Sequence, residues 1–193
     1  VEAFYEWRSD ILEQVILTRD DLGNTTSQGL GNAGDAKFWG VTTDINLPLD
    51  YFLPNGLLEI SYKYRDSSFD DEITHQQRTV NKYTPNFLKL KLRQDLIKQK
   101  VAWGIEYKGD FTDTNYRVDE FETFSGNKRL KVFVETTRFF DLKTQIEVNN
   151  FNTSRYTRSR FLYEGDRGSE YLGSEISHRI REPEVKLSIW GTF

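Results

Sequence analysis

One stretch of the sequence combines arginines with aromatic residues in a way that suits an anion. Guanidinium groups donate paired hydrogen bonds to carboxylates and phosphates, and three of them follow one another in the segment "RYTRSRFLYEG", residues 155–165. The candidate ligand contacts in this predicted loop are Arg155, Tyr156, Arg158, Arg160 and Tyr163. The simpler interpretation is a hairpin whose arginines pair with the nearby Glu164 and Asp166.

Residue types for catalysis or metal binding are not grouped in the sequence. His75 and His178 are the only two histidines, and no second histidine stands at ligand spacing from either. The acidic run Asp70 to Glu72 lacks the spaced ligands and the glycine of a calcium loop, so we interpret it as solvated charge. The glycines of "GLGNAGD" do not lie between a strand and a helix, as a phosphate-binding loop would. We expect no enzyme activity, cofactor or metal.

Composition limits the class of protein. The 193 residues contain 26 Lys+Arg and 30 Asp+Glu, a formal charge of -4, which argues against a dedicated nucleic-acid binder. The mean hydropathy is -0.66, and no run approaches the roughly 20 apolar residues of a transmembrane helix. A transmembrane β-barrel stays possible, because only alternate residues of its strands touch lipid. Cysteine is absent. Methionine is absent too, even at position 1, so we expect a processed or excised piece.

Period-two alternation of apolar and polar residues is the strongest local signal, and it predicts strands. A helical turn or a strand fits residues 10–17 equally well. The alternation predicts about eight strands and no convincing helix, with strands near residues 1–7, 37–47, 58–65, 88–93, 101–108, 130–135, 142–149 and 184–193.

The predicted connections alternate between short and long ones. The long ones are polar and cover residues 66–86, 109–129 and 151–183, with a further one between the first two strands. Short periplasmic turns and long extracellular loops are typical of outer-membrane barrels. The pattern therefore predicts an all-β fold, an antiparallel transmembrane β-barrel of about eight meander strands, with both chain ends at the short-turn end. Aromatic residues near that end fit an interfacial girdle: Tyr51, Phe52, Phe139, Phe140, Trp190 and Phe193.

The energetic cost of buried charge sets the orientation of such strands in a bilayer. Each Lys or Arg that faces lipid near mid-bilayer costs roughly 2–4 kcal/mol. Outward-facing Lys89, Lys91 and Arg93 would together cost about 6–12 kcal/mol, which is comparable to the stability of a whole fold. In a membrane, the leucines between them must therefore face lipid, and the charged residues must face the interior.

The last strand resembles a known targeting signal. It ends on alternating apolar residues and a final aromatic residue: Leu187, Ile189, Gly191 and Phe193. Such an ending resembles the signal by which the barrel-assembly machinery recognises outer-membrane proteins. We therefore expect these four residues to act as the membrane-insertion signal.

Further motifs resemble the C-terminal strands of TonB-dependent receptors. The segment "GNAGDAKFWGVTTDINL" has Asn32, Ala36 and Gly40 at the positions of a recurrent strand motif of that family. "VNNFN" at 148–152, "AFYEWRSDI" at 3–11 and the final "GTF" are similar to other strand motifs of that family. The resemblance spans nearly the whole chain, although Thr42 and Thr43 replace the acidic residue that often follows the motif glycine.

The resemblance implies a bacterial outer-membrane receptor that imports a nutrient such as a siderophore, a sugar or a vitamin. Such receptors have 22 strands and a plug that contacts TonB, and neither the plug nor the other strands are in this chain. Residues 1–193 are then a single barrel domain or a barrel segment, in contact with outer-membrane lipid and lipopolysaccharide and not with nucleic acid. In this setting the arginine-rich segment would bind a chelated metal–siderophore anion or a lipopolysaccharide phosphate. The alternatives are a self-contained eight-stranded barrel with a structural or adhesive role and a soluble lipocalin-like binder with its apolar faces inward.

Overall fold

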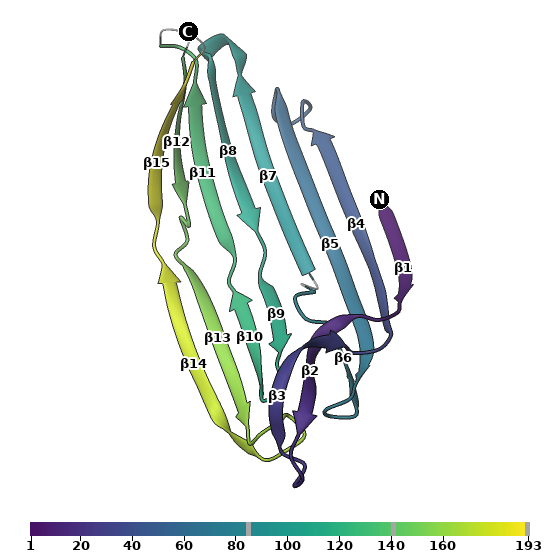
Figure 1. Ribbon diagram of the computed structural model, residues 1–193. Helices are drawn as coiled ribbons and strands as arrows, with labels where there is room; N and C mark the ends of the chain where they lie inside the picture. Colours follow the sequence, from purple (N-terminus) through teal and green to yellow (C-terminus); the bar gives the residue numbers. More distant parts are fainter. Residues whose placement is uncertain (84–85, 140–141, 192–193) are drawn as a thin grey trace.

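The protein is a curved wall of antiparallel strands (Figure 1). The computed structural model describes residues 1–83, 86–139 and 142–191. Its largest sheet contains, in spatial order, β1 (Glu2–Arg8), β4 (Ala36–Pro48), β5 (Gly56–Asp71), β7 (Asn86–Leu96), β8 (Val101–Lys108), β11 (Arg129–Thr136), β12 (Lys143–Asn149) and β15 (Glu184–Trp190). The short β6 (Gln76–Arg78) pairs with the end of β5. Each of the eight strands predicted from alternation lies on a strand of this sheet, which confirms the all-β antiparallel prediction.

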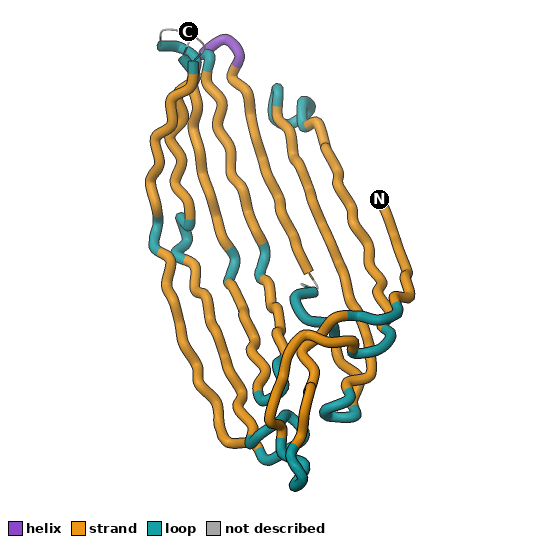
Figure 2. Tube along the Cα trace, viewed as in Figure 1, coloured by secondary structure: helices purple, strands orange, loops and turns teal. Residues whose placement is uncertain are grey.

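A second sheet continues the wall beyond the first. It has the order β14 (Tyr171–Arg181), β13 (Ser154–Tyr163), β10 (Glu120–Gly126) and β9 (Phe111–Tyr116). Each of its strands is separated from a strand of the main sheet by only a few residues. The chain thus passes from β8 into β9, from β10 into β11, from β12 into β13 and from β14 into β15 (Figure 2). The prediction of long polar loops at 109–129 and 151–183 was therefore wrong, because most of these residues form two long hairpins.

A separate hairpin crosses the wall at the end where the predicted long connections lie (Figure 1). It consists of β2 (Leu12–Arg19) and β3 (Thr25–Asn32), so residues 12–17 are strand and not helical turn. The small hydrophobic core lies where the chain enters and leaves this hairpin: Ile11, Ala33, Ala36, Phe38 and Phe69. Apolar burial thus fixes the base of the hairpin against β4 and β5.

The short connections lie together at the opposite end, as predicted. They are residues 49–55, a 3-10 turn at Ile97–Gln99 and residues 137–142, of which 140 and 141 lie outside the described residues. Trp190 of β15 is opposite Lys143, so the last strand ends there too. The N-terminus does not, because Glu2 lies opposite Thr42, near the middle of β4. That part of the prediction was wrong.

Two glycines allow aromatic rings to cover neighbouring strands closely. A Cβ atom on Gly104 would lie 2.5 Å from the backbone oxygen of Leu92 and 2.6 Å from the ring of Phe133. On Gly40 it would lie 2.5 Å from the backbone oxygen of Tyr64 and 2.7 Å from the ring of Phe4. Rings that lie over strand glycines in this way restore the packing that the missing side chain would supply.

The wall has two edges in the part of the chain that the structure describes. There β1 pairs with β4 alone, and β15 pairs with β12 alone. The sheet is therefore open, and its closure into a barrel stays a prediction. The described residues contain no helix with the length and apolar character that a membrane crossing requires.

Candidate functional site

One face of the main sheet carries a band of apolar side chains without a charged residue. The strand register aligns Leu47, Leu58, Leu92, Ile105, Val132, Val148 and Val185 in one continuous row across seven strands. We define the apolar band as this row with its neighbours on the same face: Thr43, Ile45, Ile60, Tyr62, Leu88, Leu90, Gln94, Leu96, Val101, Trp103, Tyr107, Leu130, Val134, Thr136, Thr144, Ile146, Leu187 and Ile189. Several members are more than half exposed, among them Val134 at 53% and Ile146 at 52%.

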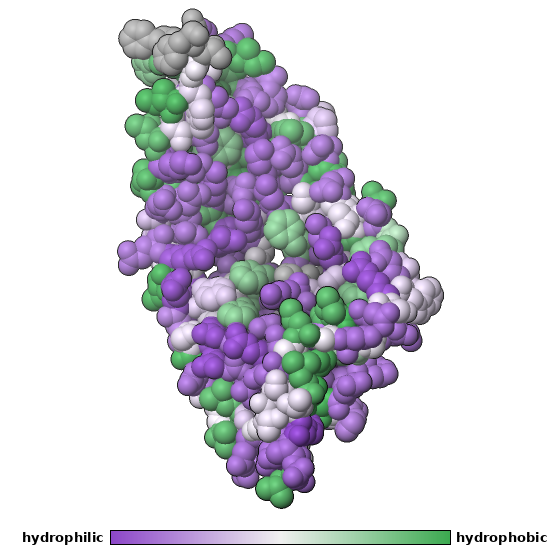
Figure 3. Space-filling view, in the orientation of Figure 1, coloured by the Kyte–Doolittle hydropathy of each residue, from purple (hydrophilic) through white to green (hydrophobic). Residues whose placement is uncertain are grey.

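The opposite face of the same strands is polar, and neighbouring strands are joined there by ion pairs. Figure 3 shows this face, which is largely hydrophilic. Neighbouring strands are linked by Glu59–Lys91 at 2.9 Å, Glu106–Lys89 at 3.6 Å, Lys131–Glu147 at 2.6 Å and Glu135–Lys143 at 3.0 Å. Arg93 of β7 reaches across β8 to contact Glu135 of β11, and Glu106 also pairs with Lys108 of its own strand at 3.2 Å. We call this polar side of the sheet the ionic face. Its charges pair along the sheet.

Trp190 differs from the predicted girdle. It lies opposite Lys143, whose Nζ is 5.7 Å from the centre of the indole ring, so its side chain belongs to the ionic face. Tyr51, Phe52 and Phe139 are exposed near the short turns, at 92%, 83% and 60%. Phe140 and Phe193 lie outside the described residues.

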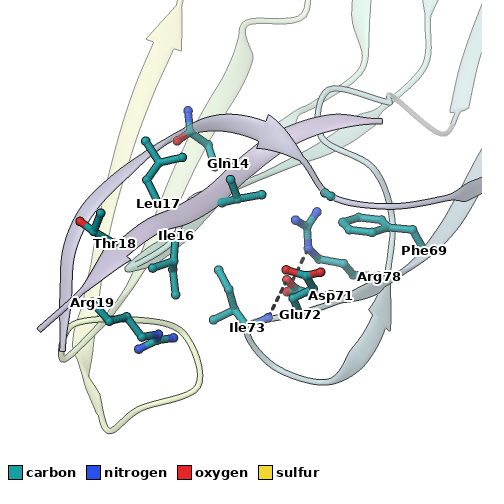
Figure 4. Close-up of a pocket in the computed structure, with 12 residues that line it drawn as sticks. Gln14, Ile16, Leu17, Thr18, Arg19, Phe69, Asp71, Glu72, Ile73 and Arg78 are labelled. Carbon is teal, nitrogen blue, oxygen red and sulfur yellow. Dashed lines mark hydrogen bonds and ion pairs between the residues drawn. The ribbon is translucent and has the colours of Figure 1, made fainter. Parts of the chain in front are cut away.

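A buried charge cluster joins four segments at the other end of the wall, and Figure 4 shows two of its members, Asp71 and Arg78. The cluster contains Glu13 from β2, Asp71 from the end of β5, Arg78 from β6 and Arg167 from the β13–β14 turn, and each side chain is at most 7% exposed. Asp71 Oδ2 accepts from Arg167 Nη1 at 2.6 Å and from Arg78 Nε at 3.1 Å. Arg78 Nη2 reaches Glu13 Oε2 at 3.3 Å. The alternating signs leave the cluster electrically neutral.

Aromatic rings and an asparagine complete the surroundings of Arg78. Its guanidinium carbon lies 4.3 Å from the ring centre of Phe69 and 4.4 Å from that of Tyr116. The Asn81 side chain pairs with the edge of β9, where its Nδ2 donates to Tyr116 O at 2.8 Å and its Oδ1 accepts from Tyr116 N at 2.5 Å. The neighbouring β7 begins at Asn86 and does not pair with β9. Asn81 thus binds a part of the β9 edge that has no partner strand among the described residues.

Arg167 and Arg78 keep the Asp71 carboxylate of the cluster ionised. This end of β5 lies outside the apolar band. Burial raises the pKa of Asp71, but the hydrogen bond from Arg167 and the charges of Arg167 and Arg78 outweigh burial and hold it below its usual value. Burial lowers the pKa of Arg78, and the charges of Asp71 and Glu13 act in the opposite direction. Substitution of an acidic or a basic side chain of the cluster by a neutral one would leave a buried charge without its partner.

A cavity of about 320 Å³ lies between the β2–β3 hairpin and the β5–β6 turn. Val15, Leu17 and Ile73 form part of its apolar lining, and Asp71 and Arg78 lie at one side of it (Figure 4). The described residues hold no group of three or more His, Cys, Asp or Glu side chains that could bind a metal ion. The expectation of no metal or cofactor stays a prediction.

The predicted ligand contacts of residues 155–163 all lie on β13. Strand alternation places Tyr156, Arg158 and Arg160 on one face and Arg155 and Tyr163 on the other. The structure therefore does not bring the five together into one site.

The arginines of β13 also have partners other than those predicted. Arg158 pairs with Glu122 of β10. Arg160 pairs with Glu120 at 2.5 Å and with Glu175 of β14 at 2.8 Å. The hairpin interpretation is thus confirmed, but its partners Glu164 and Asp166 were wrong, and Asp166 instead binds Arg19 at 2.9 Å.

The residues of the predicted insertion signal lie partly within the described chain. Leu187 and Ile189 belong to the apolar band and are 61% and 59% exposed. Gly191 follows the end of β15, and Phe193 lies outside the described residues. Nothing in the arrangement tests their role in insertion.

Sequence reasoning missed the charge cluster. The prediction that Asp70 to Glu72 are solvated charge was wrong for Asp71, which is 4% exposed. Glu13 is 2% exposed and lies in the stretch left open between helix and strand. No local signal could have found the cluster, because Glu13 and Arg78 are 65 positions apart.

Comparison with known proteins gave no significant match to a protein-family model, a curated protein or a solved structure. The function must therefore be argued from the two faces of the wall and from its charged sites.

Proposed function

We propose that this chain is a wall segment of a β-barrel in the bacterial outer membrane, from a TonB-dependent receptor that imports a nutrient such as a siderophore, a sugar or a vitamin. The observation that carries the proposal is the exposed apolar band on a sheet whose other face is ionic. A continuous apolar surface of this width is unusual on a protein surrounded by water. It suits the hydrocarbon core of a bilayer, where barrel strands satisfy all backbone polar groups.

The two faces argue against the lipocalin-like alternative. A lipocalin-like binder would turn its apolar side chains inward around a ligand. Here Phe133 and Glu135 of the ionic face are 7% and 9% exposed, whereas Val134 between them is 53% exposed. The hairpin also packs on the ionic face, through Phe38 and Phe69. The apolar side is thus the outer one, as a lipid-facing wall requires.

The open edges of the sheet argue against the alternative of a self-contained eight-stranded barrel. A closed eight-stranded barrel would pair its first strand with its last one, whereas β1 and β15 of the described residues pair only with β4 and β12. A wall segment of a wider barrel needs no such pairing. The proposal includes outer-membrane lipid as the partner of the apolar band and the barrel-assembly machinery as the partner of the last strand. TonB would act only through a plug outside this chain.

Cell fractionation followed by uptake assays tests the proposal. An antibody against residues 184–193 should detect a band in the outer-membrane fraction, far above the 22.7 kDa of this chain. A strain without the gene should lose energy-dependent uptake of one labelled class among ferric siderophores, sugars and vitamins, and a protonophore should abolish that uptake in the parent strain. A membrane band near 22.7 kDa with unchanged uptake would support the structural barrel instead. A band confined to the soluble fraction would contradict both.

A further inference from the structure

Two small cavities lie where the two sheets meet. They are next to the breaks between β10 and β11 and between β12 and β13, which Figure 2 shows as loop segments. The larger one has a volume of about 300 Å³ and the smaller one of about 200 Å³. Arg129 and Arg181 line both, so the cavities adjoin each other. We call them the junction cavities. Arg129 lies on the same face of β11 as Lys131 and Glu135, so this region belongs to the ionic face.

The junction cavities carry unpaired positive charge. The side chains of Arg129 and Arg181 make no ion pair, hydrogen bond or ring contact with another residue of the described ranges. Arg155 also borders the smaller cavity, but its side chain lies on the other face of β13 from Tyr156. Two lysines also line the cavities, but these are paired, Lys108 with Glu106 at 3.2 Å and Lys131 with Glu147 at 2.6 Å. Besides Glu106, the lining of the larger cavity contains one more carboxylate, that of Glu184.

This excess of positive charge contrasts with the rest of the molecule. The chain as a whole has a formal charge of -4, and the neighbouring arginines Arg158 and Arg160 both have carboxylate partners. Arg129 is only partly exposed, so water screens it less than a free surface charge. A partly enclosed guanidinium ion such as that of Arg129 is stabilised when an oxyanion accepts its paired hydrogen bonds.

The uncharged part of the lining indicates what the anion is attached to. Phe111 and Tyr156 line the smaller cavity, and their ring centres are 6.3 Å apart. Asn149 and Asn150 line the larger one and offer amide groups for polar contacts. Apolar rings beside a few convergent polar groups are typical of sites for small molecules. The aromatic pair provides a surface for a flat apolar group beside the anion.

We infer that the junction cavities bind a small water-borne molecule that joins a phosphate or carboxylate group to a flat apolar group. Arg129 and Arg181 hold the oxyanion, and Phe111 and Tyr156 contact the flat group. This site differs from the five predicted contacts on β13, of which only Arg155 and Tyr156 line it. It stands on the local charge and shape and does not depend on the receptor proposal.

Calorimetric titration of the full chain, purified in detergent, tests this inference with three probes. Phenyl phosphate carries both the anion and the ring, inorganic phosphate only the anion and phenol only the ring. We expect phenyl phosphate to bind more tightly than either of the others and its affinity to fall as salt is raised. Equal or undetectable binding of all three probes would overturn the inference without the use of any variant.

Single substitutions then test which residues bind phenyl phosphate. Arg129→Gln and Arg181→Gln should each weaken phenyl phosphate binding by about tenfold, because each removes a charge-assisted hydrogen bond. Arg129→Lys should keep part of the affinity. The matched control is Arg179→Gln, two residues from Arg181 on the same strand but outside the lining of both cavities. An equal loss in the control would mean a diffuse charge effect and would overturn the assignment to the cavities.

Discussion

At the scale of single residues, Asp71 is the carboxylate that the two buried arginines of the charge cluster share. Asp71→Asn leaves Arg78 and Arg167 buried without their shared anion, and the loss of one partner of a buried pair costs about 3 kcal/mol or more. We expect the backbone amides of β2 and β6 to lose protection from hydrogen exchange by about a hundredfold at neutral pH. Mass spectrometry of the exchanged peptides measures this.

The neighbouring Asp70 is the matched control, because its side chain is exposed and makes no ion pair with the described residues. Asp70→Asn should leave the protection of β2 and β6 unchanged. Equal loss of protection in both variants would contradict the role assigned to the cluster.

The same carboxylate predicts a dependence on pH. The folded-state pKa of Asp71 lies below the ordinary value of 3.8 for an aspartate side chain. Its contribution to stability is therefore complete above that value and is lost as the pH falls through the folded-state pKa. In the native chain, the protection factors of β2, corrected for intrinsic exchange, should stay nearly flat from about pH 6 to about pH 5 and fall as the pH is lowered further toward about pH 3, whereas in Asp71→Asn they should stay nearly flat throughout. A native chain with the flat profile of the variant would rule out this coupling.

Single residues also show what the sequence could predict about the candidate sites. The arginines of residues 155–163 were recognised as candidate anion contacts because they are close together in the chain. Their partners Glu120, Glu122 and Glu175 could not be recognised, because they come from two other strands. Arg129 and Arg181, which have no ion-pair partner among the described residues, stand in parts of the sequence without a local motif, and only the meeting of the two sheets brings them together.

At the scale of strands, the close packing at Gly104 is a test of the sheet. Gly104→Ala would place a Cβ 2.5 Å from the backbone oxygen of Leu92 on β7 and 2.6 Å from Phe133 on β11. Overpacking of this kind typically costs about 1–3 kcal/mol. We expect a lower midpoint of thermal unfolding in detergent, followed by circular dichroism. Gly109→Ala is the control, because the nearest atom to its Cβ, Leu88 Cβ, is 3.3 Å away. If the control lost as much stability as Gly104→Ala, the packing argument would fail.

Strands also explain why the sequence predicted one part of the wall and missed the other. In the main sheet one face is apolar and the other charged, so alternation reveals each strand, as in Leu88 to Arg93. In β10 and β13, Glu122 and Arg158 pair with each other on one face, and Thr123 and Ser159 face each other on the second. Both faces then carry polar residues, so the alternation is weak and the sequence pattern predicted a loop here. The hairpin β2–β3 was hidden for a related reason, because Gly29 and Gly31 interrupt the pattern of β3.

At the scale of the whole molecule, the central claim is that the apolar band meets lipid and the ionic face does not. The cysteine-free chain allows single cysteines to be labelled without a background. Ile146 and Gln145 are neighbours on β12, and they belong to the apolar band and to the ionic face, respectively. A comparison of these two positions tests the orientation within a single strand.

The most direct measurement is the fluorescence of an environment-sensitive dye attached to Ile146→Cys or to Gln145→Cys, with the chain folded into phosphatidylcholine vesicles. We predict that the dye at position 146 emits at shorter wavelength and is quenched by nitroxide-labelled lipid, and that the dye at position 145 is not quenched. Equal quenching at both positions, quenching at position 145 alone or a chain that stays in the aqueous phase would contradict the account.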